Sequence, residues 1–445
     1  MAMALRPNGP PITSWLYGNL PEFKQARLET MTRWAREYGD VVGLRFGHRR
    51  IYLLSHPDLI QEVLVEQATN FTKHFSLRMT PLILGNGLLT SEGDFWRRQR
   101  RLVQPAFQKS RIASYAPVMV EYTEQLLKGW QPGDKRNIHA EMSRLTLQIA
   151  AKTLFDADAA DDAQHVGEAM QVMQESFIRL FNRLVPIPLF IPTANNIRIK
   201  RAARQLDDII YGFIRQRRAS KVNKSDLLSL LLNARDEDNS RMTDKQVRDE
   251  AMTLFLAGHE TTALALSWTW YCLSQNPDAE ASLQAEVDTV LQGTLPTFAD
   301  WSKLRFTEAV VLEAMRLYPP AYIVGREASV PCDIGGYHVP KGTTLLMSEW
   351  VVQRDPRFYD RPNDFRPWRW LDGSTQTMPR YAYFPFGGGP RLCVGRDFAM
   401  MEMVLVLATI AQRYRFTLEP GQTVKPNPAF TLHPDPGVPA VLRER

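Results

Sequence analysis

The chain has 445 residues, of which 44% are hydrophobic and 23% are charged, a composition typical of globular proteins. Its 54 Lys and Arg residues exceed its 48 Asp and Glu residues, which fits a mildly basic surface or a basic face for an acidic partner. The sequence has no basic tract interleaved with aromatic residues, so nucleic-acid binding is not expected. The three widely spaced cysteines, Cys272, Cys332 and Cys393, argue against a disulfide framework and favour a reducing compartment.

The N-terminal stretch MAMALRPNGPPITSWLYGNL contains no run of about 18 apolar residues of the kind that spans a membrane. It also lacks the basic segment, apolar core and cleavage site that a secretory signal needs. We therefore expect a cytoplasmic protein without a membrane anchor.

The first half of the chain predicts mostly helices. A helix is expected from Leu20 to about Gly39, and two β-rich runs around a Gly-His turn predict a hairpin over residues 41–55. Helical patterns then continue to about Ser220. The stretch FIRLFNRLVPIPLFIPTANN, residues 177–196, interrupts them with prolines among large apolar residues. It fits a buried loop as well as a mobile apolar lid over a pocket.

A long helix is predicted from Thr243 to Pro277. Thr243 and Gln246 form a capping-box pattern at its start, and Pro277 ends it. At about 1.5 Å per residue this helix is roughly 45–50 Å long, enough to cross a domain. Further helices follow to about Tyr318, and the rest of the chain has the pattern of short strands and turns. These elements predict one domain over residues 1–445, mainly α with a minor β portion.

The segment FPFGGGPRLCVGRDFAM, residues 384–400, places a lone cysteine on a glycine loop before a strongly apolar helix. It has neither the Gly-Lys-Ser/Thr of a phosphate-binding loop nor a good dinucleotide fingerprint, and neither other cysteine lies nearby for a zinc or redox pair. The helix N-terminus and the nearby amides favour a thiolate at Cys393. These residues alone leave Cys393 as a metal ligand, a nucleophile or a structural thiol.

Phe386, Gly389, Arg391, Cys393 and Gly395 have the spacing F-x-x-G-x-R-x-C-x-G. This pattern resembles the haem-binding loop of the cytochrome P-450 family, the haem-thiolate monooxygenases. The resemblance implies the cytochrome P-450 fold, with a long central helix over the haem and the cysteine loop beneath it. It also implies haem b, iron protoporphyrin IX, as the cofactor and Cys393 as the thiolate ligand of its iron, a ligand that favours O–O bond cleavage.

A second motif, LAGHETTA at residues 256–263, places a glycine and polar side chains in the middle of the long helix. On its own it fits an exposed helix face, or a Thr261 hydroxyl bonding back to the Ala257 carbonyl. It resembles the oxygen-activating A-G-x-E/D-T motif of the same family. The resemblance implies that Thr261 hydrogen-bonds to dioxygen during its activation and that Glu260 supplies protons. His259 is expected to be structural.

A third motif is the pair Glu313 and Arg316 in LEAMRLYPP. On its own such a pair is usually a surface salt bridge. It resembles the family's E-x-x-R, and PNDFRPWRW supplies Arg369 as the third member of the buried ionic network that the resemblance implies. Trp370 stands where the family often has phenylalanine.

The remaining motif, DFWRRQRRL, contains Trp96 and Arg100 four residues apart. This spacing resembles the family's W-x-x-x-R, which implies that both residues hold a haem propionate. Arg391 and Arg326 are further propionate candidates. The other residues expected around the cofactor are Phe386, Gly387 and Ala257.

Together the motifs indicate a monooxygenase that uses O₂ to hydroxylate or epoxidise a lipophilic small molecule, a fatty acid or a terpenoid. No flavin- or nicotinamide-binding stretch follows the haem loop, so we expect no fused reductase and a separate ferredoxin or flavodoxin-type electron donor with its reductase. Arg97, Arg98 and Arg101 are either solvated or part of a basic patch for that donor. The alternatives are a peroxygenase driven by H₂O₂, a haem protein that binds a ligand without turnover, and a cysteine-dependent hydrolase without haem.

Overall fold

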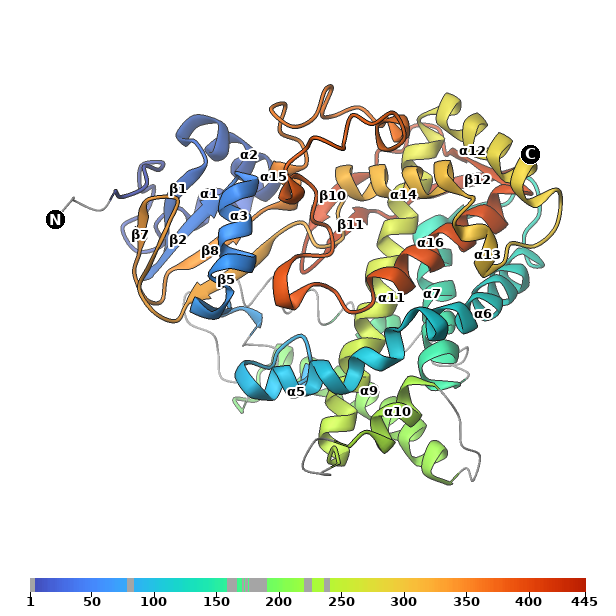
Figure 1. Cartoon of the computed structure of the whole chain (residues 1–445), viewed down its shortest axis with the longest axis horizontal. Coiled ribbons are helices and arrows are strands. Elements are labelled where there is room, and N and C mark those ends of the chain that lie inside the picture. The colour runs from blue at the N-terminus through green and yellow to red at the C-terminus, as the bar shows by residue number, and fades with distance from the viewer. Residues whose placement is uncertain are drawn as a thin grey trace.

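The computed structural model describes residues 5–77, 84–157, 166–169, 172, 175, 190–219, 226–235 and 241–445. Most of these residues belong to helices that gather around the long helix α11, while the largest sheet lies to one side, near the N-terminus (Figure 1). The predicted architecture, mainly α with a minor β portion, is confirmed.

The helices of the described residues differ widely in length. The α-helices are α1 (Leu20–Gln25), α2 (Arg27–Tyr38), α3 (Pro57–Gln61), α5 (Gly93–Val103), α6 (Lys109–Leu127), α7 (Ile138–Phe155), α9 (Ala194–Ala219), α10 (Leu227–Asn233), α11 (Asp244–Ser274), α12 (Pro277–Leu291), α13 (Phe298–Trp301), α14 (Arg305–Leu317), α15 (Glu349–Val352) and α16 (Arg396–Ala411). Shorter turns of other helix types are η1 (Glu62–Glu66), η2 (Ala68–Asn70), η4 (Gln104–Phe107), η5 (Pro367–Trp370), η6 (Arg380–Ala382) and η7 (Gly389–Arg391).

The strands form one larger sheet and three small ones. They are β1 (Val41–Phe46), β2 (Arg49–Leu54), β3 (Phe71–Lys73), β4 (Lys135–Asn137), β5 (Val324–Ala328), β6 (Cys332–Ile334), β7 (Tyr337–Val339), β8 (Thr344–Met347), β9 (Tyr414–Leu418), β10 (Lys425–Pro428), β11 (Leu432–Asp435) and β12 (Pro439–Glu444). The larger sheet has the order β1-β2-β8-β5-β3, and only its β2–β8 pair is parallel. The small sheets are β10-β11, β4-β12-β9 and β6-β7.

The N-terminal predictions are largely confirmed. The helix expected from Leu20 to Gly39 is broken at Ala26, whose φ of −152° and ψ of 75° are not helical, so it forms α1 and α2. The predicted hairpin is present as β1 and β2, with Val42 opposite Leu53. Gly47 in its turn has a φ of +62°, a conformation that glycine adopts without steric cost.

Helix α11 begins and ends close to the predicted residues. The Thr243 side chain accepts from Gln246 N and the Gln246 side chain accepts from Thr243 N, so the capping box is complete. The helix has 31 residues and ends at Ser274, shortly before Pro277. At about 1.5 Å per residue it is about 46 Å long. α7, α9, α14 and α16 pack against it, which explains why nearly all of its residues from Val247 onward are buried.

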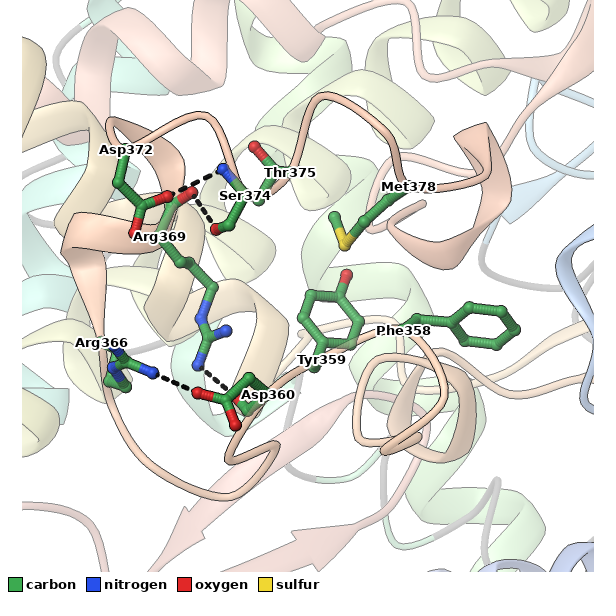
Figure 2. Close-up of a pocket in the computed structure, with 9 residues that line it drawn as sticks. All are labelled: Phe358, Tyr359, Asp360, Arg366, Arg369, Asp372, Ser374, Thr375 and Met378. Atoms are coloured by element: carbon green, nitrogen blue, oxygen red, sulfur yellow. Dashed lines mark hydrogen bonds and ion pairs between the residues drawn. The ribbon is translucent and has the colours of Figure 1, made fainter.

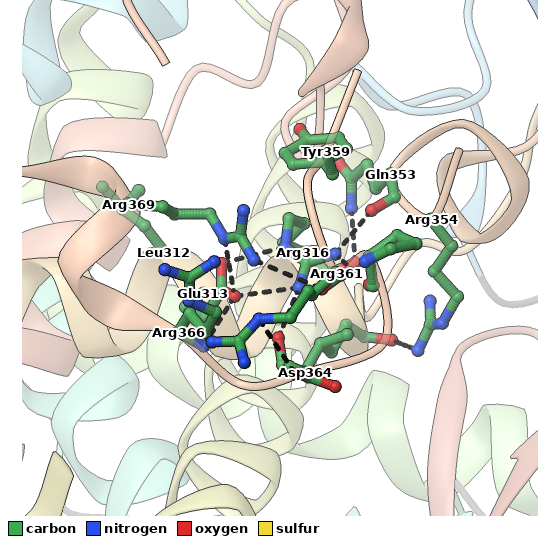
Figure 3. Close-up of polar contacts among 12 residues, drawn as sticks. Leu312, Glu313, Arg316, Gln353, Arg354, Tyr359, Arg361, Asp364, Arg366 and Arg369 are labelled. Carbon is green, nitrogen blue, oxygen red and sulfur yellow. Dashed lines mark hydrogen bonds and ion pairs between the residues drawn. The ribbon is translucent and has the colours of Figure 1, made fainter. Parts of the chain in front are cut away.

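A buried ionic network joins α14 to the segment around η5 (Figure 3). Glu313 Oε1 accepts from Arg316 Nη2 at 2.8 Å and from Arg369 Nε at 3.0 Å, and the side chains of all three residues are at most 5% exposed. The predicted trio is therefore confirmed as a buried network. Removing one member would leave an uncompensated buried charge, at a cost of about 3–5 kcal/mol.

Trp370 adds a contact to this network that the sequence did not predict. Its Nε1–H donates to Glu313 Oε2 at 3.0 Å, and Arg366 N donates to Glu313 Oε1 at 2.9 Å. Arg316 also donates to the backbone carbonyls of Gln353, Pro362 and Asp364. Tryptophan in place of phenylalanine thus supplies one more donor to a buried carboxylate.

Replacing this tryptophan tests the contact. Trp370→Phe keeps an aromatic ring but removes the donor to Glu313, so we expect the free energy of unfolding to fall by about 1.5–3 kcal/mol, the range for hydrogen bonds to charged groups. Urea denaturation followed by circular dichroism measures it. Trp368→Phe is the matched control, because Trp368 lies in the same turn and is 39% exposed. Equal losses in the two variants would contradict a specific role for the Trp370 donor.

Candidate functional site

The loop that carries Cys393 leads into α16 and is closed by backbone hydrogen bonds. Cys393 N donates to the Phe386 carbonyl at 3.0 Å, and Leu392 N donates to the Gly389 carbonyl at 3.1 Å. Gly389 has a φ of +63° and lies against the Leu64 carbonyl of η1, where any Cβ would collide. Glycine is therefore required at this position, and the close approach fixes the loop against η1.

The thiol of Cys393 is accessible yet closely surrounded by protein. The residue is exposed, but burial of the thiol by neighbouring atoms raises its pKa. The backbone hydrogen bond from Gly395 and the charges of Arg100 and Arg396 act in the opposite direction, while Asp397 adds to the rise. The amide at the start of α16 thus acts as predicted, but it does not outweigh burial. Metal coordination deprotonates a cysteine thiol, so the thiolate at Cys393 stays a prediction for the metal-bound protein.

Three of the residues predicted to hold a propionate lie together beside this loop. The Arg391 guanidinium lies over the Trp96 ring, 4.3 Å from its centroid, and forms an ion pair with Glu92. Arg100 Nη1 donates to the Leu392 carbonyl at 2.8 Å. α5 is therefore fastened directly to the loop that carries the cysteine.

The fourth predicted residue, Arg326 of β5, pairs with Lys73 of β3 in antiparallel register. Lys73 was not predicted to take part in the site, and its only sign in the sequence is a lysine between the two phenylalanines of FTKHF. Lys73 is 4% exposed, and its Nζ donates to the Leu88 and Ser91 carbonyls at 2.8 and 3.1 Å. Burial and the charge of Arg391 lower the pKa of Lys73 to about 6 and that of Arg326 to about 10.

This cluster of cations carries more positive charge than the acids beside it can neutralise. Burial raises the pKa of Glu250 to about 8, so this carboxyl is largely protonated at neutral pH, and burial raises the pKa of Glu349 well above its usual range. Glu92 is the remaining carboxylate among the described acids that act on Lys73, Arg326 and Arg391. With Lys73 largely neutral at its lowered pKa, the two charges of Arg326 and Arg391 exceed the one of Glu92. A carboxylate ligand such as a haem propionate fits this surplus and would also favour the protonated form of Lys73.

Phe386 and Gly387 come shortly before the cysteine. Phe386 is partly buried and packs against the helical core. Gly387 has a φ of +71°, and its N–H donates to the Phe384 carbonyl at 2.8 Å. Both residues therefore shape the backbone on which the thiol is held.

In α11 the Thr261 hydroxyl donates to the Ala257 carbonyl at 2.7 Å, the back-bonded arrangement considered from the sequence. Glu260 is turned to another side of the helix, since consecutive residues are about 100° apart. Its Oε1 accepts from Thr431 Oγ1 at 2.7 Å and from His433 Nε2 at 3.1 Å. The two predicted catalytic residues are therefore neighbours in sequence whose side chains have different partners.

The surroundings of Glu260 determine its protonation. Burial by itself raises the pKa of this carboxyl, but the hydrogen bond and charge of His433, with the Thr431 hydroxyl and the charge of His259, lower it below the usual value. His259 is 4% exposed, and its Nε2 lies 3.0 Å from Ser143 Oγ of α7. This contact agrees with the structural role expected for His259.

Much of the apolar segment expected to form a lid or a buried loop, residues 177–196, lies outside the described residues. Of the part that is described, Phe190 is 79% and Ile191 39% exposed. Within the described part of the chain, no helix is long and apolar enough to cross a membrane.

A separate pocket of about 270 Å³ lies beside the ionic network (Figure 2). It is lined by Phe358, Tyr359, Asp360, Arg366, Arg369, Asp372, Ser374, Thr375 and Met378. Its arginines are paired locally, because Arg366 bonds to the Asp360 carboxylate at 2.8 Å and Arg369 to the Asp360 carbonyl at 3.1 Å. None of the residues predicted to contact the cofactor lines it, so this pocket is not the candidate cofactor site.

Comparison with known proteins identifies relatives of the whole chain. The family model described as Cytochrome P450 matches residues 7–440. Cyclooctatin synthase from Streptomyces melanosporofaciens is 40% identical over 402 residues, covering 90% of this chain and 88% of the relative. Cyclooctat-9-en-7-ol 5-monooxygenase from the same organism is 34% identical, covering 94% and 93%.

Pentalenene oxygenase from Streptomyces avermitilis is 35% identical over 398 residues, covering 89% of this chain and 88% of the relative. The chain belongs to the cytochrome P450 family, the haem-thiolate monooxygenases.

Proposed function

We propose that this enzyme uses dioxygen to hydroxylate or epoxidise a terpenoid. The observation that carries the proposal is the set of relatives above, which are named for cyclooctatin, cyclooctat-9-en-7-ol and pentalenene and align with 89% to 94% of this chain. Terpenoids are lipophilic, the property expected of the substrate from the sequence. Fatty acids, the other predicted class, serve as the comparison compounds.

We assign Cys393 as the ligand of the iron of haem b, and Trp96, Arg100, Arg326 and Arg391 as residues that hold its propionates. The exposed cysteine on a fixed loop and the cluster of cations beside it support this assignment, and the same cluster adds Lys73 to the propionate residues. Phe386, Gly387 and Ala257 are the remaining contacts assigned to the cofactor. When bound, the haem supplies the metal that activates dioxygen, and the thiolate donates electron density to it.

Glu260 and Thr261 are assigned to proton transfer. The Thr261 hydroxyl, now bonded to the Ala257 carbonyl at 2.7 Å, can turn to donate to oxygen in the site. Glu260 is buried and its lowered pKa keeps it ionised, so it is a carboxylate that can accept a proton away from bulk water and pass it on through a bridging water.

We assign the supply of electrons to a separate ferredoxin or flavodoxin-type donor with its reductase. Residues 1–445 are assigned to a single haem-thiolate domain. Helix α5 is the surface on which an acidic donor would dock. It exposes Arg97 and Arg101, and Arg98 is partly exposed. Because Arg100 of the same helix donates to the Leu392 carbonyl, a donor docked there would lie close to the cysteine loop.

A spectral binding screen tests the substrate class. We expect pentalenene and cyclooctat-9-en-7-ol to shift the Soret band of the purified ferric protein from low spin to high spin, because an apolar ligand expels water from beside the iron. Lauric acid is the comparison compound. A full shift with lauric acid and none with either terpenoid would contradict the terpenoid assignment.

Thr261→Ala tests proton transfer. The variant should keep its haem and its melting temperature, but product formed per electron should fall by at least about tenfold, with the electrons recovered as hydrogen peroxide. Thr262→Val is the matched control, since the Thr262 hydroxyl is buried and has no hydrogen-bond partner among the described residues. Coupling at the wild-type level in Thr261→Ala would show that this hydroxyl has no such role.

Lys73→Met tests the unpredicted propionate contact. Loss of one hydrogen bond to a charged group, about 1.5 kcal/mol or more, should speed haem dissociation by about tenfold, measured by transfer to apomyoglobin. Lys135→Met is the control, because the Lys135 side chain is 72% exposed on β4. An unchanged dissociation rate in Lys73→Met would remove Lys73 from the site.

A further inference from the structure

A buried group of polar side chains joins α11 to the β10–β11 hairpin. Glu260 Oε1 lies 2.7 Å from Thr431 Oγ1 and 3.1 Å from His433 Nε2, and the last two atoms are 2.9 Å apart. An ionised carboxylate can only accept hydrogen bonds, so the hydrogen on His433 must be at Nε2. Thr431 donates its hydroxyl hydrogen to the same carboxylate oxygen. His433 is thus bonded directly to the acid assigned above to proton transfer.

The hairpin that carries His433 is held firmly against the rest of the fold. Leu432 N donates to the Pro320 carbonyl at 2.9 Å, and the Leu432 carbonyl accepts from Trp268 Nε1 of α11 at 2.9 Å. The Tyr322 hydroxyl donates to the Ala429 carbonyl, also at 2.9 Å. These bonds lie directly before His433 in the chain, so its ring is positioned against Glu260 by the backbone as well as by its own contact.

His433 also reaches solvent. Its side chain is 15% exposed, and the side chain of Glu260 is 11% exposed. Nε2 of His433 faces the carboxylate, which leaves Nδ1 as its second site for a proton. Imidazole is the side chain that gains and loses protons near neutral pH, and its two nitrogens allow a proton to enter at one and leave from the other.

The other histidines around this group are less suited to carry a proton. His139 of α7 lies edge-on to His433, with ring centroids 5.7 Å apart, and its Nδ1 is 3.1 Å from Ser267 Oγ. Burial and the charges of His433 and His259 lower the pKa of His139 to about 4. Burial likewise lowers the pKa of His259 to about 4. Both rings are therefore neutral at pH 7, and neither is hydrogen-bonded to Glu260 in the contacts described.

We propose that His433 is a positioning residue that supplies Glu260 with the protons consumed in turnover, an inference that rests on the proton-transfer role proposed for Glu260. A proton from water binds His433 Nδ1, and the imidazolium passes its Nε2 proton to Glu260 Oε1. The products are a neutral imidazole and a carboxylic acid. Once Glu260 has passed its proton on, exchange with water moves the hydrogen of His433 back to Nε2. No electrons are transferred in these steps.

His433→Gln separates proton supply from simple positioning. The glutamine amide retains an N–H donor for Glu260 but cannot carry a proton through the side chain. With pentalenene as probe and a plant-type ferredoxin with its reductase, product per electron should fall at least about tenfold in His433→Gln and in His433→Ala. His338→Gln is the matched control, since His338 also contacts a carboxylate, Asp333, at 3.1 Å but on an exposed hairpin.

Two comparisons distinguish failure of the His433 proposal from failure of the Glu260 relay. If His433 acts through Glu260, the double variant Glu260→Gln/His433→Gln should be no less coupled than Glu260→Gln alone. Reduced coupling in Glu260→Gln together with wild-type coupling in His433→Gln would overturn the proton-supply role alone. Wild-type coupling in Glu260→Gln would overturn the relay on which it rests.

A measurement that needs no substrate tests the contact itself. The ring signals of His433 are followed by NMR of histidine-labelled protein in the diamagnetic ferrous carbon monoxide form, with the signals assigned by their loss in His433→Gln. Replacing Glu260 by glutamine should move the His433 Nε2 signal at a fixed pH, because the carboxylate that accepts its hydrogen bond has been removed. An unchanged Nε2 signal in Glu260→Gln would overturn the inference.

Discussion

The position of the Cys393 sulfur depends on one close backbone contact. Gly389 lies against the Leu64 carbonyl so closely that no side chain fits between them, and its positive φ turns the chain there. Next to the cysteine in the chain, the Leu392 carbonyl accepts from Arg100 of α5. A loop fixed at two points presents its thiol in one place, which a metal ligand requires.

The charges beside this loop link the fold to its cofactor. Lys73, Arg326 and Arg391 are brought together by strand pairing and by the cysteine loop, and burial makes their like charges costly. An anionic group that binds the folded chain and not the unfolded one stabilises the fold by mass action. The surplus of positive charge beside the cysteine loop therefore makes haem binding and the stability of the chain interdependent. The charge of Glu313, in contrast, is neutralised by arginines of the protein itself.

The features predicted best from the sequence depend on residues close together in the chain. The capping box of α11 and the Glu313–Arg316 pair follow from spacings of three residues, and the resemblance added Arg369. Lys73 and His433 were missed because their roles arise from pairing between distant segments. Lys73 reaches the site through β3–β5, and His433 reaches Glu260 across 173 positions of sequence. For Thr261 the sequence offered the bond back to the Ala257 carbonyl that the structure shows, but it did not reveal the partners of Glu260.

The account as a whole depends on the thiolate of Cys393 binding the iron, and one spectrum tests this most directly. The purified haem-loaded protein is reduced and exposed to carbon monoxide. The wild type and a Cys332→Ser control should give a Soret band at about 450 nm, as thiolate-ligated ferrous haem does. Cys393→Ser should lose that band. Folded wild-type protein that carries haem and gives only a band at clearly shorter wavelength would contradict the central claim.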